Sequence, residues 1–189
     1  MSAITAALPH RKFTVDEYHR FIETGVFSAE ERLELWEGEF IEMSPIGKKH
    51  ASCVNYLIEF LRDRLGKAVI ISPQNPIVLN DFSEPQPDIC LLNRREDFYR
   101  QNTPTAQDVL MVMEIADTTL RYDRDVKFPR YAASGIREAW LIDLENDRVE
   151  IYSEPTVNGY SLVRILHRGQ EAHSTIFPEI QISVEDILG

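Results

Sequence analysis

The feature that most constrains the fold is the apolar run VLMVM at 109–113, which is followed directly by Glu114. A short apolar run of this kind is typical of a strand in a buried sheet. A carboxylate at the end of such a strand is costly to bury unless it is ion-paired, hydrogen-bonded or bound to a metal. The run therefore predicts a buried sheet, and Glu114 indicates a polar site at its edge. A glutamate that points to solvent is the alternative.

The rest of the chain combines helical periodicity with short strand patterns. Thr14 and Glu17 have the spacing of a capping box, and Gly38 allows the turn of a hairpin over 32–43. Apolar residues with helical spacing predict a long helix at 48–65. Strands are expected at 68–72, 76–80, 87–92, 109–115, 138–144, 148–153 and 161–167, and helical segments within 94–108, at 124–134 and at 183–188. This order predicts an α/β (α+β) fold in which helices flank a mixed central sheet.

Length and charge narrow the class of protein. The 189 residues suit one domain that spans 1–189, and no run approaches the roughly 20 apolar residues of a membrane helix. The net charge of −11 argues against a static nucleic-acid coat, because phosphate neutralisation drives non-specific binding. It argues less against a metal enzyme, whose carboxylates are offset by bound cations. No glycine-rich loop follows an expected strand, so Rossmann or P-loop chemistry is not indicated.

Two further features predict a cytoplasmic protein. The N-terminal segment MSAITAALPHRK lacks a basic region followed by a long apolar stretch, so no signal peptide is expected. Cys53 and Cys90 are the only cysteines, and their spacing is not that of a metal site. We therefore expect both to be reduced thiols.

Two carboxylates at strand ends are the best candidates for chemistry. Asp88 follows Pro87 at the start of one expected strand, and Glu114 closes another. If the two strands are neighbours, both groups can meet at one edge of the sheet. Hard oxygen ligands suit Mg²⁺ or Mn²⁺, and such an ion polarises a phosphoryl oxygen and acidifies a bound water. A nearby lysine can orient that water or stabilise the developing charge.

These residues resemble a known family. Pro87-Asp88 and Glu114 within MEIAD resemble the signature of the PD-(D/E)XK nucleases. A longer series is similar to the Uma2 family of restriction-endonuclease-like proteins, also called DUF820, over about residues 13–152. This series consists of RLELWEGEFIEMSP, His50, PDI and VMEIADTTLRYDRDVKFPRYAASGIREAWLID. The resemblance implies a restriction-endonuclease-like core and a metal-dependent endonuclease that acts on DNA.

The resemblance also implies roles for particular residues. Asp88, Glu114 and the carbonyl of Ile115 would bind Mg²⁺, with Mn²⁺ as a substitute, and Lys127 would assist the attacking water. Glu34 matches an acidic position of the family, where it would hold a second metal or orient Lys127.

The sequence departs from the family pattern at two positions near Glu114. Ala116 stands where the general nuclease signature has its lysine, and the family instead places the lysine at Lys127 on the next helix. Asp117 replaces a serine that is usual in the family, and it would either add a ligand or disturb the site. Pro129 inside the expected helix predicts a kink unless it falls in the first turn.

Each candidate has a structural alternative. Asp88 would be a turn residue at the start of a strand, and Lys127 would be a solvated lysine on a helix. Tyr131 would fill the core. Glu34 suits an exposed strand face with Glu37, Glu39 and Glu42. His50 would contact a phosphate or make a local hydrogen bond, and Asp123 would cap the next helix. Basic side chains recur every third residue and form either a phosphate-binding band or ion pairs with Asp123 and Asp125; they are Arg121, Arg124, Lys127 and Arg130.

Three functions follow from these patterns. The leading one is a metal-dependent DNA endonuclease that acts as a monomer or a homodimer. The second is a non-catalytic module that keeps the nuclease fold to bind a partner or nucleic acid. The third is a metal-free hydrolase with paired carboxylates about 5–9.5 Å apart, such as a glycosidase. Metal dependence separates the first from the third, and the effect of changing Glu114 separates the first from the second.

Overall fold

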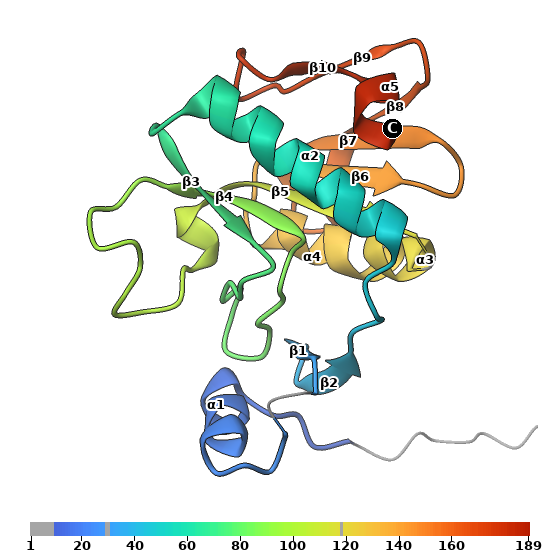
Figure 1. Ribbon diagram of the computed structural model, residues 1–189. Helices are drawn as coiled ribbons and strands as arrows, with labels where there is room; N and C mark the ends of the chain where they lie inside the picture. The colour runs from blue at the N-terminus through green and yellow to red at the C-terminus, as the bar shows by residue number, and fades with distance from the viewer. Residues whose placement is uncertain (1–9, 29–30, 118) are drawn as a thin grey trace, which may run out of the picture.

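A mixed six-stranded sheet forms the centre of the computed structural model, which describes residues 10–28, 31–117 and 119–189 (Figure 1). In spatial order its strands are β3 (Val69–Pro73), β4 (Ile89–Asn93), β5 (Val109–Ala116), β6 (Glu138–Asp143), β7 (Arg148–Thr156) and β8 (Gly159–His167). β5 and β6 are parallel, and the other neighbouring strands are antiparallel. The predicted mixed α/β sheet is therefore confirmed.

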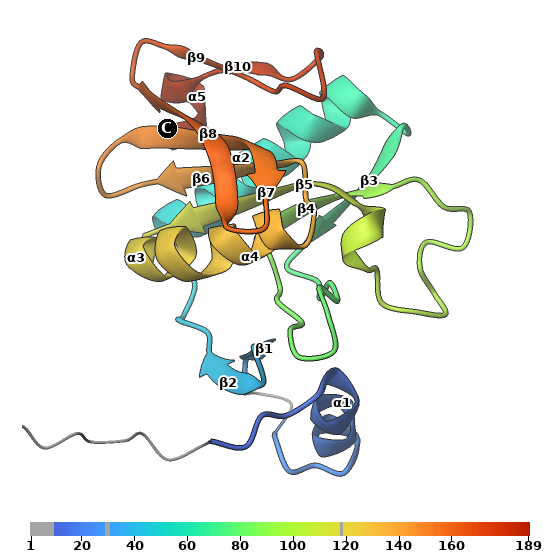
Figure 2. The same cartoon turned by 180° about the vertical axis from the view of Figure 1, so that it is seen from behind.

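Helices cover both faces of this sheet, as Figures 1 and 2 show from opposite sides. One face carries α2 (Lys48–Leu65) and α5 (Val184–Leu188). The other carries α3 (Leu120–Tyr122), the π-helix η2 (Asp123–Lys127) and α4 (Phe128–Ala133).

The central strand β5 contributes to both layers. Met111 and Met113 pack toward α2, whereas Val112 and Ala116 pack toward α4. Because side chains alternate along a strand, Glu114 shares the face of Val112 and Ala116. The apolar run is thus buried on both sides, and its carboxylate is directed at η2 and α4.

The N-terminal part forms a smaller unit beside the sheet (Figure 1). It consists of α1 (Val15–Glu23) and the hairpin of β1 (Leu33–Trp36) and β2 (Glu39–Glu42), which pack around Tyr18 and Leu35. The predicted capping box is present, since Thr14 and Glu17 each accept a backbone hydrogen bond from the other. Leu35 and Glu84 exchange backbone hydrogen bonds of 3.4 and 2.8 Å, which tie the hairpin to the loop that precedes β4.

One predicted strand is wrong, and one predicted short helix is present only as a 3₁₀ turn. The expected strand at 76–80 makes only isolated bridges, because Pro76 has no N–H and the N–H groups of Ile77 and Val78 bond to loop carbonyls. The expected helix within 94–108 is reduced to the three-residue 3₁₀-helix η1 (Ala106–Asp108). The short pair β9 (Glu171–His173) and β10 (Gln181–Ser183) was not predicted, since three-residue strands carry too little pattern.

The helix expected at 124–134 starts earlier and is not regular. It begins with α3, continues through η2, where the N–H of Phe128 bonds to the carbonyl of Asp123, and ends in α4. Pro129 is the second residue of α4, so the irregular π-turn lies directly before the proline, inside one continuous helical stretch. The prediction that Asp123 caps this helix is wrong, because Asp123 is buried within it.

Several other expectations concern the chain as a whole. Cys53 and Cys90 are buried free thiols. Within the described ranges, no helix is long and apolar enough to cross a membrane. The segment 1–9, to which the prediction of no signal peptide refers in part, lies outside the described residues. The single-domain prediction stays a prediction.

Candidate active site

The structure brings Asp88 and Glu114 together at one edge of the sheet. β4 and β5 are antiparallel neighbours with Ile89 opposite Met113, so the residue before β4 lies beside Glu114. The N–H of Asp88 donates to Glu114 Oε2 at 3.4 Å, and the N–H of Ile115 donates to Asp88 Oδ2 at 2.9 Å. Asp88 and Glu114 are only 9 % and 2 % exposed. The expected meeting of the carboxylates is confirmed, and their catalytic roles stay predictions.

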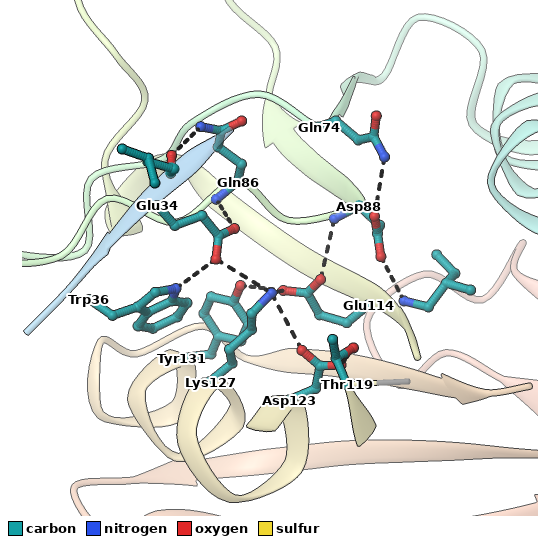
Figure 3. Close-up of polar contacts among 12 residues, drawn as sticks. Glu34, Trp36, Gln74, Gln86, Asp88, Glu114, Thr119, Asp123, Lys127 and Tyr131 are labelled. Carbon is teal, nitrogen blue, oxygen red and sulfur yellow. Dashed lines mark hydrogen bonds and ion pairs between the residues drawn. The ribbon is translucent and has the colours of Figure 1, made fainter. Parts of the chain in front are cut away.

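Lys127 occupies the centre of a group of carboxylates (Figure 3). Its Nζ lies 3.3 Å from Glu114 Oε1, 3.4 Å from Asp123 Oδ1 and 3.7 Å from Glu34 Oε2. The residue is 8 % exposed, so the interpretation as a solvated helix lysine is wrong. The lysine reaches Glu114 because η2 packs over the face of β5 to which Glu114 points. Ala116 also faces this layer, where it is buried in the apolar core.

Glu34 enters the site from the separate N-terminal unit. Its Oε2 accepts a hydrogen bond of 2.8 Å from Trp36 Nε1, and its Oε1 accepts one of 2.8 Å from the N–H of Gln86. Glu34 is buried, whereas the other three acids of the hairpin, Glu37, Glu39 and Glu42, are exposed. The exposed-face alternative is therefore wrong for Glu34, and its position matches the predicted contact with Lys127.

Further side chains hold the two central carboxylates. Tyr131 donates to Glu114 Oε1 at 2.6 Å, so this residue both fills the core and touches the site. His50 Nε2 lies 2.8 Å and Gln74 Nε2 lies 3.3 Å from Asp88 Oδ1. Burial lowers the pKa of His50, but the adjacent Asp88 carboxylate outweighs this effect and raises the pKa above its ordinary value. The predicted local hydrogen bond of His50 is confirmed.

Four residues of this network were missed at the sequence level. They are Trp36, Gln74, Gln86 and Thr119, of which Thr119 donates to Asp123 Oδ2 at 2.6 Å. Trp36 stands two residues after Glu34 on the same strand face, and this spacing is the one available signal. The two glutamines lie in loops and come close only through the tertiary fold.

The network carries excess negative charge. Four buried acids, Glu34, Asp88, Glu114 and Asp123, surround the single ammonium of Lys127. Burial raises the pKa of Glu114 to about 8. The charge of Lys127 lowers this pKa, whereas the neighbouring acids raise it. Burial alone would lower the pKa of Lys127, but the surrounding carboxylates raise it well above its ordinary value. Lys127 therefore stays charged, and Glu114 takes up a proton unless another cation compensates.

A cavity of about 280 Å³ opens beside these groups. It is lined by Asp88, Glu114 and Lys127 at its base and by Asp117. Its walls come from the hairpin, from the connection 43–47, from the start of α2 and from the α3–η2 segment. The carboxylates are thus reached through a recess between the N-terminal unit and the sheet.

The donor set fits a hard divalent cation. Asp88 and Glu114 supply carboxylate oxygens from adjoining strands, and Mg²⁺ is typically bound by one or two carboxylates while it keeps several waters. The uncompensated acids would be neutralised by such an ion. Among the described residues, no group of three or more His, Cys, Asp or Glu side chains is arranged to hold a metal ion. With Asp88 and Glu114 as its carboxylate ligands, an ion bound here would take its remaining ligands from water and backbone carbonyls.

The predicted basic band is wrong. Arg124 pairs with Glu150 across the sheet edge, and Arg130 pairs with Glu37. Arg121 is exposed, while Lys127 is buried in the acidic network. The four cations thus point to different places.

Comparisons with known proteins agree with this architecture. No curated protein gives a significant match. The fold is similar to a crystal structure described as "a putative nuclease belonging to DUF820" from Anabaena variabilis ATCC 29413. That similarity has a TM-score of 0.72 and 16 % identity, and it covers 93 % of this chain and 97 % of the other. The family model Uma2, described as "Putative restriction endonuclease", matches residues 15–185. The chain therefore belongs to the Uma2 family.

Proposed function

We propose that this protein is a metal-dependent phosphodiesterase that cleaves DNA internally. The observation that carries the proposal is the pair Asp88 and Glu114, buried side by side beneath a cavity with Lys127 against Glu114. A buried group of this composition is costly for folding and indicates a binding or catalytic role. The Uma2 family and the structural neighbour are both described as nucleases, which supports the same reaction class.

In this proposal Asp88, Glu114 and the carbonyl of Ile115 would hold Mg²⁺ or Mn²⁺. The ion would supply Lewis acidity and a water of lowered pKa. His50 and Gln74 fix the carboxylate of Asp88 through its Oδ1, which leaves the group oriented before any ligand arrives.

Lys127 has the contacts expected of a group that acts on the attacking water. Hydrolysis forms a bond from a water oxygen to phosphorus while one phosphorus–oxygen ester bond breaks, and the departing oxygen gains a proton. The ammonium of Lys127 has three donors: one donates to Glu114 Oε1 at 3.3 Å, and Glu34 Oε2 at 3.7 Å lies beyond hydrogen-bond distance, so a donor remains for a group in the cavity that Lys127 lines. Lys127 would donate to the water or to a phosphoryl oxygen, and Glu34 and Asp123 would keep it in place.

The test is cleavage of plasmid, short duplex and single-stranded DNA with Mn²⁺. Wild type, Lys127→Ala, Lys127→Arg and the control Lys67→Ala, which changes an exposed lysine, are compared. Loss of a positioned donor is expected to lower the rate by roughly 10²–10³-fold. Arginine should not restore the rate, because its planar fork differs in shape and hydration. If wild type is active and Lys127→Ala cuts equally fast, the assigned role of Lys127 is wrong.

Metal binding is tested separately through thermal stability. A cation that binds only the folded state raises its stability, by about 2.7 kcal/mol at a hundredfold excess over Kd. Glu114→Gln should reduce this shift while the fold is retained, and Lys127→Ala should largely preserve it, since the lysine is not a ligand. If the melting temperature of wild type does not change with millimolar Mg²⁺ or Mn²⁺, the result would favour the non-catalytic module.

A further inference from the structure

The candidate active site is recessed. Its four acids and Lys127 are at most 9 % exposed, and they are reached through a cavity of about 280 Å³. This volume is at the lower end for small-ligand pockets, which span roughly 300–1,000 Å³. A double helix, whose major groove alone is about 12 Å wide, cannot enter such a recess. An unpaired strand is narrower and fits such a recess more readily than a duplex does.

The lining of the cavity is poor in cations that could hold a duplex by its phosphates. Arg32, Lys127 and His50 are its basic side chains, and Lys127 is already surrounded by acids. Six acids also line it: Glu34, Glu42, Asp88, Glu114, Asp117 and Asp123. Because phosphate neutralisation contributes to the binding of both duplex and single-stranded DNA, this lining offers little affinity for phosphates alone, and contacts with bases must contribute.

Apolar and aromatic side chains also line the cavity. Met43, Pro45 and Ile46 line it from the connection between β2 and α2, and Tyr122 lines it from α3. Ile46 is 44 % exposed, although it is a large aliphatic residue. Apolar and aromatic side chains of this kind bind the faces of unpaired bases, which a duplex keeps stacked inside.

From the recess, and from the exposed Ile46 and the half-buried Tyr122 in its lining, we infer that the substrate is a single DNA strand, with bases packed on Ile46 and Tyr122 while one phosphodiester enters the cavity. This inference rests on the proposed nuclease function and adds the form of DNA that the site accepts. Unpaired regions within larger DNA molecules belong to the same class.

The test compares oligothymidylate, the same strand paired with oligoadenylate, and a circular single strand, each with Mn²⁺. The single strands should be cut at least about tenfold faster than the duplex, which corresponds to roughly the stacking free energy of one base. Ile46→Ser should raise KM for the single strand with little change in kcat. Ile165→Ser is the matched control, because Ile165 is 49 % exposed on β8 and does not line the cavity.

The outcomes separate this inference from the function on which it rests. Duplex cleavage as fast as single-strand cleavage would overturn the inference and leave the nuclease function standing. Equal KM values for Ile46→Ser and Ile165→Ser would refute the role of Ile46. Absence of cleavage of every substrate, together with no Mn²⁺-induced melting shift, would remove the nuclease proposal and this inference with it.

Discussion

The turn of the N-terminal hairpin gives a sharp test of how Glu34 is positioned. Gly38 has φ +82°, and a Cβ added there would lie 2.5 Å from Lys12 Cβ and 3.0 Å from Lys12 Cα. The N–H of Gly38 donates to Phe82 O at 2.8 Å, and its carbonyl accepts from Phe13 N at 2.9 Å. A side chain at this position must therefore displace the chain at Lys12 and Phe13.

The expected cost of Gly38→Ala follows from these contacts. The left-handed conformation costs alanine about 1–2 kcal/mol, and weakening two backbone hydrogen bonds costs about 0.5–1.5 kcal/mol each. Lower entropy of the unfolded chain offsets about 0.4–1 kcal/mol. We expect a net loss of about 1–4.5 kcal/mol in the free energy of unfolding.

Gly25→Ala is the matched control for this prediction. Gly25 has φ +71°, but an added Cβ would meet nothing within 4 Å, so only the conformational cost of about 1 kcal/mol applies. Urea unfolding followed by tryptophan fluorescence measures both variants, and Trp36 in the hairpin reports directly on its environment. Equal losses for the two variants would show that the contact with Lys12 does not constrain the turn.

Two further predictions concern charge. Because burial raises the pKa of Glu114 from 4.5 to about 8, the folded state binds this proton more tightly, so the contribution of Glu114 to stability falls as pH rises through this interval. Without metal, the unfolding free energy of wild type minus that of Glu114→Gln should decrease over the same interval, and a constant difference would contradict the assigned burial effect. Arg124→Gln removes one partner of the buried acids Asp143 and Glu150. It should lower the free energy of unfolding, measured with urea, by about 1–3 kcal/mol, a range discounted for the partial exposure of the arginine. Arg121→Gln on the exposed side of the same helical segment should stay within about 0.5 kcal/mol, and a similar loss in both variants would contradict the role of the ion pairs.

The sequence predicted the acids at the sheet edge for a physical reason. Glu114 ends an apolar strand, and Asp88 directly precedes another strand. Both carboxylates are therefore at the ends of strands, and the sequence prediction only had to assume that the two strands pair. Lys127 was different, because lysines on helices are usually solvated and its burial depends on tertiary packing. Its assignment came from the family resemblance and not from spacing.

Other parts of the site could not be predicted from local patterns. Gln74 and Gln86 lie in loops whose paths are set by the surrounding fold. The buried position of Glu34 depends on the bonds between Leu35 and Glu84, which join residues far apart in the chain. The expected strand at 76–80 had the right composition, but its hydrogen bonds go to loops, and composition does not reveal the partner of a backbone group.

The number of residues in the π-helix η2 determines which side chains face Glu114. Asp123, Lys127 and Tyr131 are spaced four apart, and all three side chains meet the same carboxylate cluster across the widened turn. Because the π-turn closes an i→i+5 hydrogen bond, deleting one residue within 123–127 would convert it to an α-turn that keeps Tyr131 against Glu114 and rotates the residues before the deletion by about 100°. Two relatives that both carry a lysine in this segment, but differ in length by one residue, would present different side chains to that carboxylate. Alignment gaps within this segment consequently change which residue is equivalent to Lys127.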